Sequence, residues 1–151
     1  MLTQTNQTTS LDFAEIISRL FSNCQEKEMR HASKFGVSIV EFRCLRALYD
    51  KNGITVNELA QKMSLTSSRV TRIIDNLVSK KLVTREIGTR DRRIYNLHLT
   101  AKGESLAGEL IDHYREIHGQ ILKSIPSDER EKMITSLYRL NNAVEKWLID
   151  K

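Results

Sequence analysis

The chain has 151 residues, with 24 lysine and arginine residues against 19 aspartate and glutamate residues, a formal net charge of +5 at pH 7. Charged residues make up 28% of the chain, and together with a single proline they favour a largely helical globular protein. No run approaches the ~18 apolar residues of a membrane span, so we expect no membrane partner. The start, MLTQTNQTTS, has no basic or apolar leader pattern, and the two cysteines form no close pair. We therefore expect a reduced, cytoplasmic protein.

A first helix is predicted from about Leu11 to Ser33. Apolar side chains recur there at helical spacing, and Gly36 follows as a stop signal. Residues 1–10 are polar and are expected to fray. The helix is longer than a small lobe needs, so it can serve as a partner surface. Its apolar stripe consists of Phe13, Ile16, Ile17, Leu20, Phe21 and Cys24.

Two capping boxes mark the starts of the next two helices. In Ser38–Glu41 and Thr55–Glu58, a hydroxyl and a carboxylate three residues apart can each accept from a free backbone NH of the first turn. The second helix is expected to end at Gly53 and the third near Lys62. A tight connection then leads into a fourth helix, so the third and fourth helices form a helix-turn-helix.

The fourth helix is amphipathic and is predicted to be capped by Thr66. Its buried stripe consists of Val70, Ile73, Ile74, Leu77 and Val78. Its opposite face carries Ser68, Arg72, Asp75, Asn76 and Ser79, flanked by Arg69 and Thr71. Guanidinium, hydroxyl and amide groups thus gather on one exposed face.

Two strands of a hairpin are predicted next, over Leu82–Ile87 and Ile94–Leu99. The tip between them, from Gly88 to Arg93, contains three arginines, which must project into solvent or onto an anion; we call it the basic wing. From Thr66 to Lys102, nine lysine and arginine residues meet three acids, a net of +6, whereas the rest of the chain has a net charge of −1. This concentration indicates a phosphate-facing surface. A merely solvated hairpin would not explain the polar helix face beside it.

Two more helices follow the hairpin. Thr100 is expected to cap a fifth helix, and Ser127 a sixth whose first turn is acidic. The buried side of the fifth helix is predicted at Leu106, Leu110, Ile111, Ile117, Ile121 and Leu122. The sixth repeats apolar residues at spacings of four and three, at Met133, Leu137, Leu140, Val144 and Trp147. Such a repeat is typical of a helix that packs lengthwise on another, either in a partner or within the same chain.

With these features in place, the sequence resembles the MarR family of winged-helix transcriptional regulators. The resemblance covers nearly the whole chain and rests on LAQKMSLTSSRVTRIIDNLVSKKLVTR, on Asp91-Arg92-Arg93 and on LTAKG at Leu99 to Gly103. It implies a fold that is mainly α with a small β-hairpin wing. It also implies a homodimer, with residues 1–36 and 101–151 as the dimerisation lobe and residues 37–100 as the DNA-binding lobe.

The resemblance also implies roles for individual residues. The fourth helix would enter the major groove of double-stranded DNA through Ser67, Ser68, Thr71 and Arg72. The wing would place Arg93 in the minor groove, oriented by Asp91. From their positions, we expect Arg72 to contact a base, and Arg90, Arg92 and Lys80 to contact phosphates. The complete predicted DNA-binding set is Thr66, Ser67, Ser68, Arg69, Thr71, Arg72, Asn76, Lys80, Arg90, Asp91, Arg92 and Arg93.

One position departs from the family pattern. The family commonly has glycine after the recognition helix, where this chain has Lys81. Either the helix ends differently here, or the lysine adopts a left-handed conformation at some cost. The first strand can therefore start a residue or two away from Leu82.

The histidines and cysteines do not form a recognisable metal or redox site. His113 and His118 are five residues apart, whereas two ligands on one helix face need a spacing of three or four. Zinc-sensing members of the family carry a histidine after the glutamate of the second helix, where this chain has Phe42. Cys24 and Cys44 lie in helical patterns, so we expect both to be buried, with a thiol-based redox sensor as the alternative.

No phosphate-binding loop or nucleophile motif is present, so we expect no enzyme and no cofactor. The expected partners are double-stranded DNA, a second copy of the chain and a small aromatic or anionic effector, with release from DNA as the effector's action. A winged-helix module that binds only proteins is the main alternative. Such a module would not need the net charge of +6 over the helix and the wing.

Overall fold

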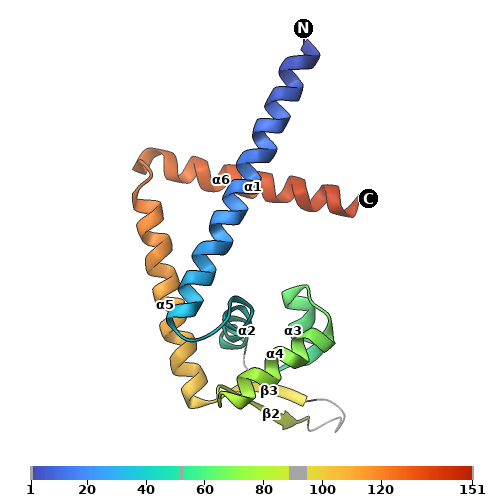
Figure 1. Ribbon diagram of the computed structural model, residues 1–151, viewed down its shortest axis with the longest axis vertical. Coiled ribbons are helices and arrows are strands. Elements are labelled where there is room, and N and C mark those ends of the chain that lie inside the picture. Colours follow the sequence, from blue (N-terminus) through green and yellow to red (C-terminus); the bar gives the residue numbers. More distant parts are fainter. Residues whose placement is uncertain (1, 52, 89–94, 151) are drawn as a thin grey trace. The chain divides into compact units, whose positions relative to one another are not determined.

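The structure is a computed structural model that describes residues 2–51, 53–88 and 95–150 (Figure 1). The helices are α1 (Leu2–Lys34), α2 (Ile39–Asp50), α3 (Val56–Met63), α4 (Ser67–Ser79), α5 (Ala101–Lys123) and α6 (Ser127–Ile149). The strands are β1 (Ile54–Thr55), β2 (Val83–Ile87) and β3 (Tyr95–Leu99). The predicted fold class, mainly α with a small β wing, is confirmed.

The chain forms two compact units, residues 1–111 and residues 112–151. The first unit holds α1 to α4, the sheet and the start of α5, and the second holds the rest of α5 and α6. These units differ in their bounds from the predicted DNA-binding and dimerisation lobes, which are defined by function and stay a prediction.

Both predicted capping boxes are confirmed. The Ser38 hydroxyl accepts from the Glu41 NH at 3.2 Å, and the Glu41 carboxylate accepts from the Ser38 NH at 2.8 Å. Thr55 and Glu58 make the same two bonds at 3.2 and 2.8 Å. The Thr55 NH and hydroxyl, followed by the ammonium of Lys51, lower the pKa of Glu58 to about 2. These local bonds set where α2 and α3 begin.

The sheet has three antiparallel strands in the order β1-β3-β2. Strand β2 pairs with β3 from Val83 opposite Leu99 to Ile87 opposite Tyr95. The prediction missed β1, whose two residues pair with Leu97 and Asn96 of β3. A strand this short has no alternation of its own, and Thr55 also caps α3. Strand β2 starts at Val83, one residue later than predicted, and the predicted start of β3 at Ile94 lies outside the described residues.

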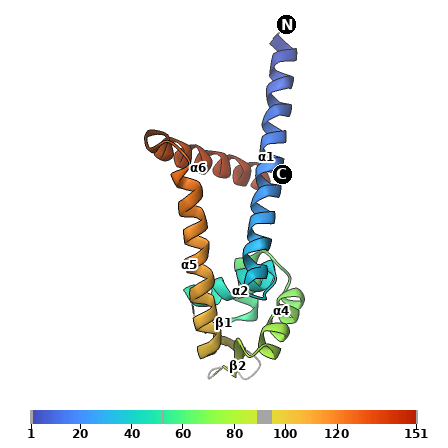
Figure 2. The same ribbon diagram turned by 60° about the vertical axis from the view of Figure 1, so that its left-hand side comes forward.

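The core of the first unit lies among α2, α3, α4 and the sheet, which gather around one another in Figure 1 and Figure 2. Its largest fully buried side chains include Phe42, Leu45, Leu48, Leu59, Ile74, Leu77 and Leu97, and Leu110 of α5 is fully buried as well. Four residues of the stripe predicted for α4 are buried, but Val78 is exposed, at 37%, so its predicted burial was wrong. The polar face of α4 is therefore turned outward.

Two predicted helix starts were wrong. Helix α1 begins at Leu2 and not near Leu11, because residues 1–35 contain no glycine or proline to stop the helix from extending. Helix α6 begins at Ser127 itself, with Pro126 in the N-cap position and no side-chain cap. Proline suits this position since it has no NH to satisfy and its backbone is extended there, at φ −50° and ψ 137°.

Candidate nucleic-acid interface

The structure brings the predicted residues of α4 onto one exposed surface. Thr66, Ser67, Ser68, Arg69, Thr71, Arg72 and Asn76 are all exposed. The turn before α4 is closed by Ser64 in the left-handed conformation, at φ 54°, with its NH bonded to the end of α3. Thr66 caps α4 as predicted, accepting from the Arg69 NH at 3.4 Å. Helices α3 and α4 thus form a helix-turn-helix whose second helix presents its polar face to solvent.

Hydroxyl groups at the start of α4 are held by local bonds, whereas its arginines are not. The Ser67 hydroxyl donates to Asn57 Oδ1 of α3 at 2.8 Å, and the Thr71 hydroxyl donates to the Ser67 carbonyl at 2.9 Å. Arg69 and Arg72 make no ion pair with any residue that the structure describes. Their guanidinium groups therefore remain available to an external anion.

An ion pair fastens α4 to the sheet. The Arg85 guanidinium of β2 donates to Asp75 Oδ1 of α4 at 2.6 Å. The pair compensates the charge of Asp75, which is the acid on the exposed face of α4. It also leaves Arg85 as a supporting residue, since its charge is directed at α4.

A second cationic feature adjoins α4 and was missed from the sequence. Arg69 lines a cavity of about 360 Å³ together with cations of α2 and α3. The lining residues are Val40, Arg43, Arg46, Ala47, Asp50, Lys62, Met63, Leu65 and Arg69. Two of these cations already have acids beside them: Arg43 pairs with Glu28 at 2.6 Å, and Lys62 lies 3.5 Å from Asp50. The signal in the sequence was the spacing of three between Arg43 and Arg46, which places both on one face of α2.

The predicted wing residues Arg90, Asp91, Arg92 and Arg93 lie outside the described residues. Strands β2 and β3, which lead to and from the predicted tip, are described and paired as far as Ile87 and Tyr95. The roles of these four residues stay predictions.

The end of α4 resolves the question raised by Lys81. This residue adopts the left-handed conformation, at φ 60°, so the second alternative holds and a lysine occupies the position that usually favours glycine. Its NH bonds to the Val78 carbonyl at 2.9 Å, and the Leu82 NH bonds to the Leu77 carbonyl at 2.9 Å. The Thr100 hydroxyl donates to the Lys81 carbonyl at 2.8 Å, which supports the strained residue from the start of α5.

Lys80 is engaged within the protein. Its ammonium lies 3.0 and 2.9 Å from the two carboxylate oxygens of Glu41 and 3.3 Å from the Gly36 carbonyl oxygen. Burial of Glu41 acts to raise the pKa of its carboxyl group, but Lys80 and the Ser38 NH outweigh burial, and the pKa lies below its ordinary value. The pair joins the end of α4 to the start of α2.

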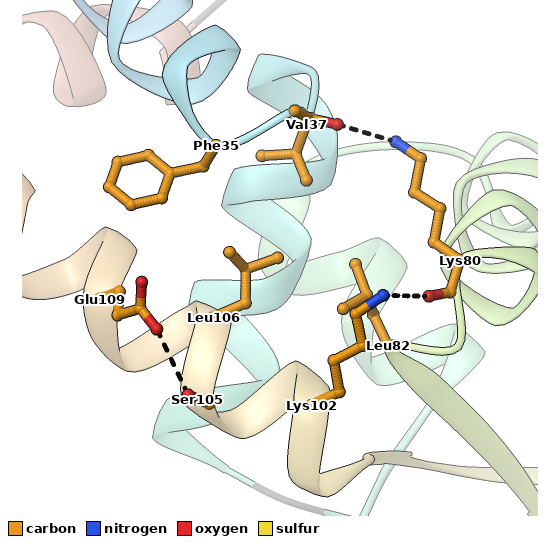
Figure 3. A pocket seen from close by; sticks show the side chains of 9 residues that line it. Phe35, Val37, Lys80, Leu82, Lys102, Ser105, Leu106 and Glu109 are labelled. Atoms are coloured by element: carbon orange, nitrogen blue, oxygen red, sulfur yellow. Dashed lines mark hydrogen bonds between the residues drawn. The ribbon is translucent and has the colours of Figure 1, made fainter.

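A larger cavity, of about 570 Å³, lies beside Lys80 (Figure 3). It is lined by Phe35, Gly36, Val37, Lys80, Leu82, Lys102, Ser105, Leu106 and Glu109. Inside it, the Lys102 ammonium donates to the Lys80 carbonyl at 3.3 Å, and the Ser105 hydroxyl donates to Glu109 at 3.3 Å. Apolar side chains, two lysines and Glu109 thus face one space. Glu109 is bonded to Ser105, so a small ligand with an apolar body and an anionic group can be accepted beside Lys102.

The cysteines differ from each other. Cys44 is buried as predicted, and burial, followed by the charge of Glu41, raises the pKa of its thiol to about 12. Cys24 is exposed, so its predicted burial was wrong, because the apolar stripe of α1 that carries it is left uncovered in the single chain. Among the side chains that the structure describes, no group of three or more His, Cys, Asp or Glu is placed to hold a metal ion. Within the same residues, no helix combines the length and the apolarity that crossing a membrane requires.

This geometry defines a winged helix-turn-helix protein, and comparisons with known proteins agree. The model of the MarR family matches residues 37–95. The chain is 30% identical over 131 residues to the HTH-type transcriptional regulator MhqR of Bacillus subtilis, covering 86% of this chain and 89% of that one. It is 27% identical over 129 residues to the HTH-type transcriptional repressor MdtR of the same organism, covering 85% and 83%. The chain belongs to the MarR family, and it is a transcriptional regulator of that family.

The fold also matches solved structures. Streptococcus pneumoniae FabT, in a crystal structure in complex with DNA, superimposes with a TM-score of 0.79 at 22% sequence identity. The match covers 90% of this chain and 97% of FabT. At this identity the likeness concerns the fold, and it agrees with the winged helix described above.

Proposed function

We propose that the protein binds double-stranded DNA as a homodimer and represses transcription from a pseudo-palindromic operator. The observation that carries the proposal is the exposed face of α4, where Arg69 and Arg72 have no acid partner among the described residues. The similar protein MdtR is a transcriptional repressor and FabT forms a complex with DNA, and both facts lend support. In a two-fold dimer, the two copies of α4 would enter successive major grooves, with half-sites about 10 base pairs apart.

The residues divide by their expected contacts. Arg72 is proposed to contact a base edge, with Ser67, Ser68, Thr71 and Asn76 around it in the major groove. Thr66 and Arg69 are proposed to meet the phosphates at the helix start. In the wing, Arg93 is proposed for the minor groove with Asp91 orienting it, and Arg90 and Arg92 for phosphates.

Replacing Arg72 with alanine should weaken binding to the selected operator by about 1 to 3 kcal/mol and relax the preference at one position in each half-site. A guanidinium can bridge O6 and N7 of guanine, and alanine offers neither bond. The operator is first selected from a random DNA pool with the wild-type protein, and the selection is then repeated with Arg72→Ala.

A matched control is Arg115→Ala, which removes the same side chain from α5, where its guanidinium pairs with Asp112. This variant should leave the selected motif unchanged. If Arg72→Ala returned the wild-type motif, the placement of α4 in the groove would be wrong. If the wild-type protein enriched no sequence and showed no salt-sensitive DNA binding, the rival function, a protein-interaction module, would be favoured.

An effector is proposed for the cavity beside Lys80, because its apolar wall and the ammonium of Lys102 suit an aromatic carboxylate. Benzoate and salicylate are the probes, measured by calorimetry and by their effect on DNA affinity. Replacing Lys102 with methionine should lower the affinity for the probe about tenfold, since a charged hydrogen bond is lost. Lys123→Met makes the same change on α5 outside the cavity lining and should have no effect. Absence of binding heat with both probes would overturn this assignment.

A further inference from the structure

The end of the recognition helix α4 is held by bonds from α5. Residues 80–82 follow α4, and each of their three carbonyl groups accepts from the start of α5 or its cap. The Lys102 ammonium donates to the Lys80 carbonyl at 3.3 Å, the Thr100 hydroxyl to the Lys81 carbonyl at 2.8 Å, and the Thr100 NH to the Leu82 carbonyl at 3.1 Å. Main-chain anchoring of this kind fixes where a helix ends, and so where its side chains lie.

The side chain of Lys80 adds an anchor on the other side, at α2. An ammonium group has three NH donors, and three acceptors surround this one: both oxygens of Glu41, at 3.0 and 2.9 Å, and the Gly36 carbonyl, at 3.3 Å. A phosphate could reach Lys80 only by displacing one of them. The predicted phosphate contact of Lys80 therefore competes with contacts that the protein already makes.

Glu41 is placed so that it can hold this lysine firmly. It is only 5% exposed, and its carboxylate also accepts from the Ser38 NH at 2.8 Å. A buried carboxylate that lost its cation would keep its charge without compensation, which is costly. Glu41 is in turn fixed by the capping box of α2, so the anchor of α4 is a rigid part of the core.

We propose that Glu41 is a positioning residue for DNA recognition, which acts through Lys80 to hold the end of α4 and does not touch DNA. Lys80 then contributes to affinity by placing α4, and not by neutralising a phosphate. The inference rests on the proposed binding of DNA, but it assigns a function to a buried carboxylate.

Glu41→Gln distinguishes two roles for Lys80, which are to position α4 and to neutralise a phosphate. The substitution keeps the size of the side chain and an oxygen that can accept from Ser38, while it removes the charge that holds Lys80. It also raises the net charge by one, so simple attraction to phosphates predicts tighter binding. If Glu41 is a positioning residue, binding becomes weaker instead, by about tenfold.

The experiment measures DNA affinity by fluorescence anisotropy at several salt concentrations, using the operator selected by the wild-type protein. Glu41→Gln and Lys80→Met should weaken binding to a similar degree, and the double variant should be no weaker than either single one. The salt dependence should keep its slope in Lys80→Met, whereas the loss of a phosphate contact would lower the slope by about one. Circular dichroism at the assay temperature shows that each variant is folded.

Glu58→Gln is the matched control, because it makes the same change in the capping box of α3, where the acid contacts Thr55 and Lys51. It should bind DNA as the wild type does. Equal or tighter binding by Glu41→Gln, or a flatter salt dependence in Lys80→Met, would overturn the inference. Failure of the wild-type protein to bind DNA would instead overturn the proposed function, so the two failures are distinguishable.

Discussion

Replacing Gly103 with alanine is expected to destabilise the protein by about 3 kcal/mol, because α5 and the end of α4 approach too closely for a side chain. A Cβ atom at Gly103 would lie 1.9 Å from the Leu82 carbonyl oxygen and 2.9 Å from the carbonyl carbon. Both neighbours are backbone atoms of a residue whose side chain is buried, so neither can turn away. Urea denaturation followed by circular dichroism measures the change in the free energy of unfolding.

The same helix offers a control. Gly119 also lies within α5, but a Cβ atom there would meet nothing within 4 Å. Gly119→Ala should therefore stabilise the protein by about 0.5 to 1 kcal/mol, since alanine is the better helix former. The two substitutions are chemically identical and should have opposite signs. A Gly103→Ala protein as stable as Gly119→Ala would show that α5 does not contact Leu82 as described.

This contact gives a physical reason for one motif behind the family resemblance. In LTAKG, Thr100 donates to the Lys81 carbonyl, Lys102 donates to the Lys80 carbonyl, and Gly103 lets the helix approach Leu82. Three of the five residues thus act on the segment that ends α4. The motif fastens the end of α4 to α5.

The features that could be predicted from the sequence are those encoded by near neighbours. The boxes Ser38–Glu41 and Thr55–Glu58 use residues three apart, and they fold as expected. The polar face of α4 follows from a repeat of 3.6 residues, and the predicted surface residues from Thr66 to Asn76 are indeed exposed. Local spacing carries this information because it determines which side chains share a face.

Contacts between distant residues could not be predicted in this way. Glu41 and Lys80 are 39 residues apart, and nothing in either local pattern indicates that one neutralises the other. Strand β1 exists only because β3 lies beside it. The error over Cys24 has a related cause: a helical stripe shows that a face is apolar, but not whether the same chain covers it.

The exposed apolar stripe of α1 predicts that two copies of the chain assemble. In the single chain, large apolar side chains remain exposed along this helix: Leu11 at 71%, Phe13 at 53%, Ile16 at 62%, Leu20 at 47% and Phe21 at 63%. Leaving them in water costs roughly 25 cal/mol for each Å² of apolar surface. A second copy of the chain offers the same stripe and can cover it through a two-fold axis. Helix α6 has no buried residue among those described and carries Leu137, Tyr138, Val144 and Trp147 exposed as well.

Light scattering should therefore give a mass of twice the 17.5 kDa of one chain. Replacing Phe21 with aspartate should return the monomer mass at micromolar concentration, because the dimer would have to bury an unpaired carboxylate. DNA affinity should fall on the order of 100-fold, since two linked recognition helices gain avidity that one helix lacks. Sedimentation and anisotropy on the same sample measure both changes.

The neighbouring residue supplies the control for charge. Ser22 is exposed about 100° further around α1 than Phe21, away from the centre of the apolar stripe, and Ser22→Asp adds the same negative charge. This variant should stay dimeric and keep its DNA affinity, apart from a small loss from the added charge. A wild-type protein of monomer mass would contradict the dimer, and a dimeric Phe21→Asp variant would exclude this stripe as its interface. A monomeric Phe21→Asp variant that bound the operator as tightly as the wild type would show that one recognition helix suffices for DNA binding.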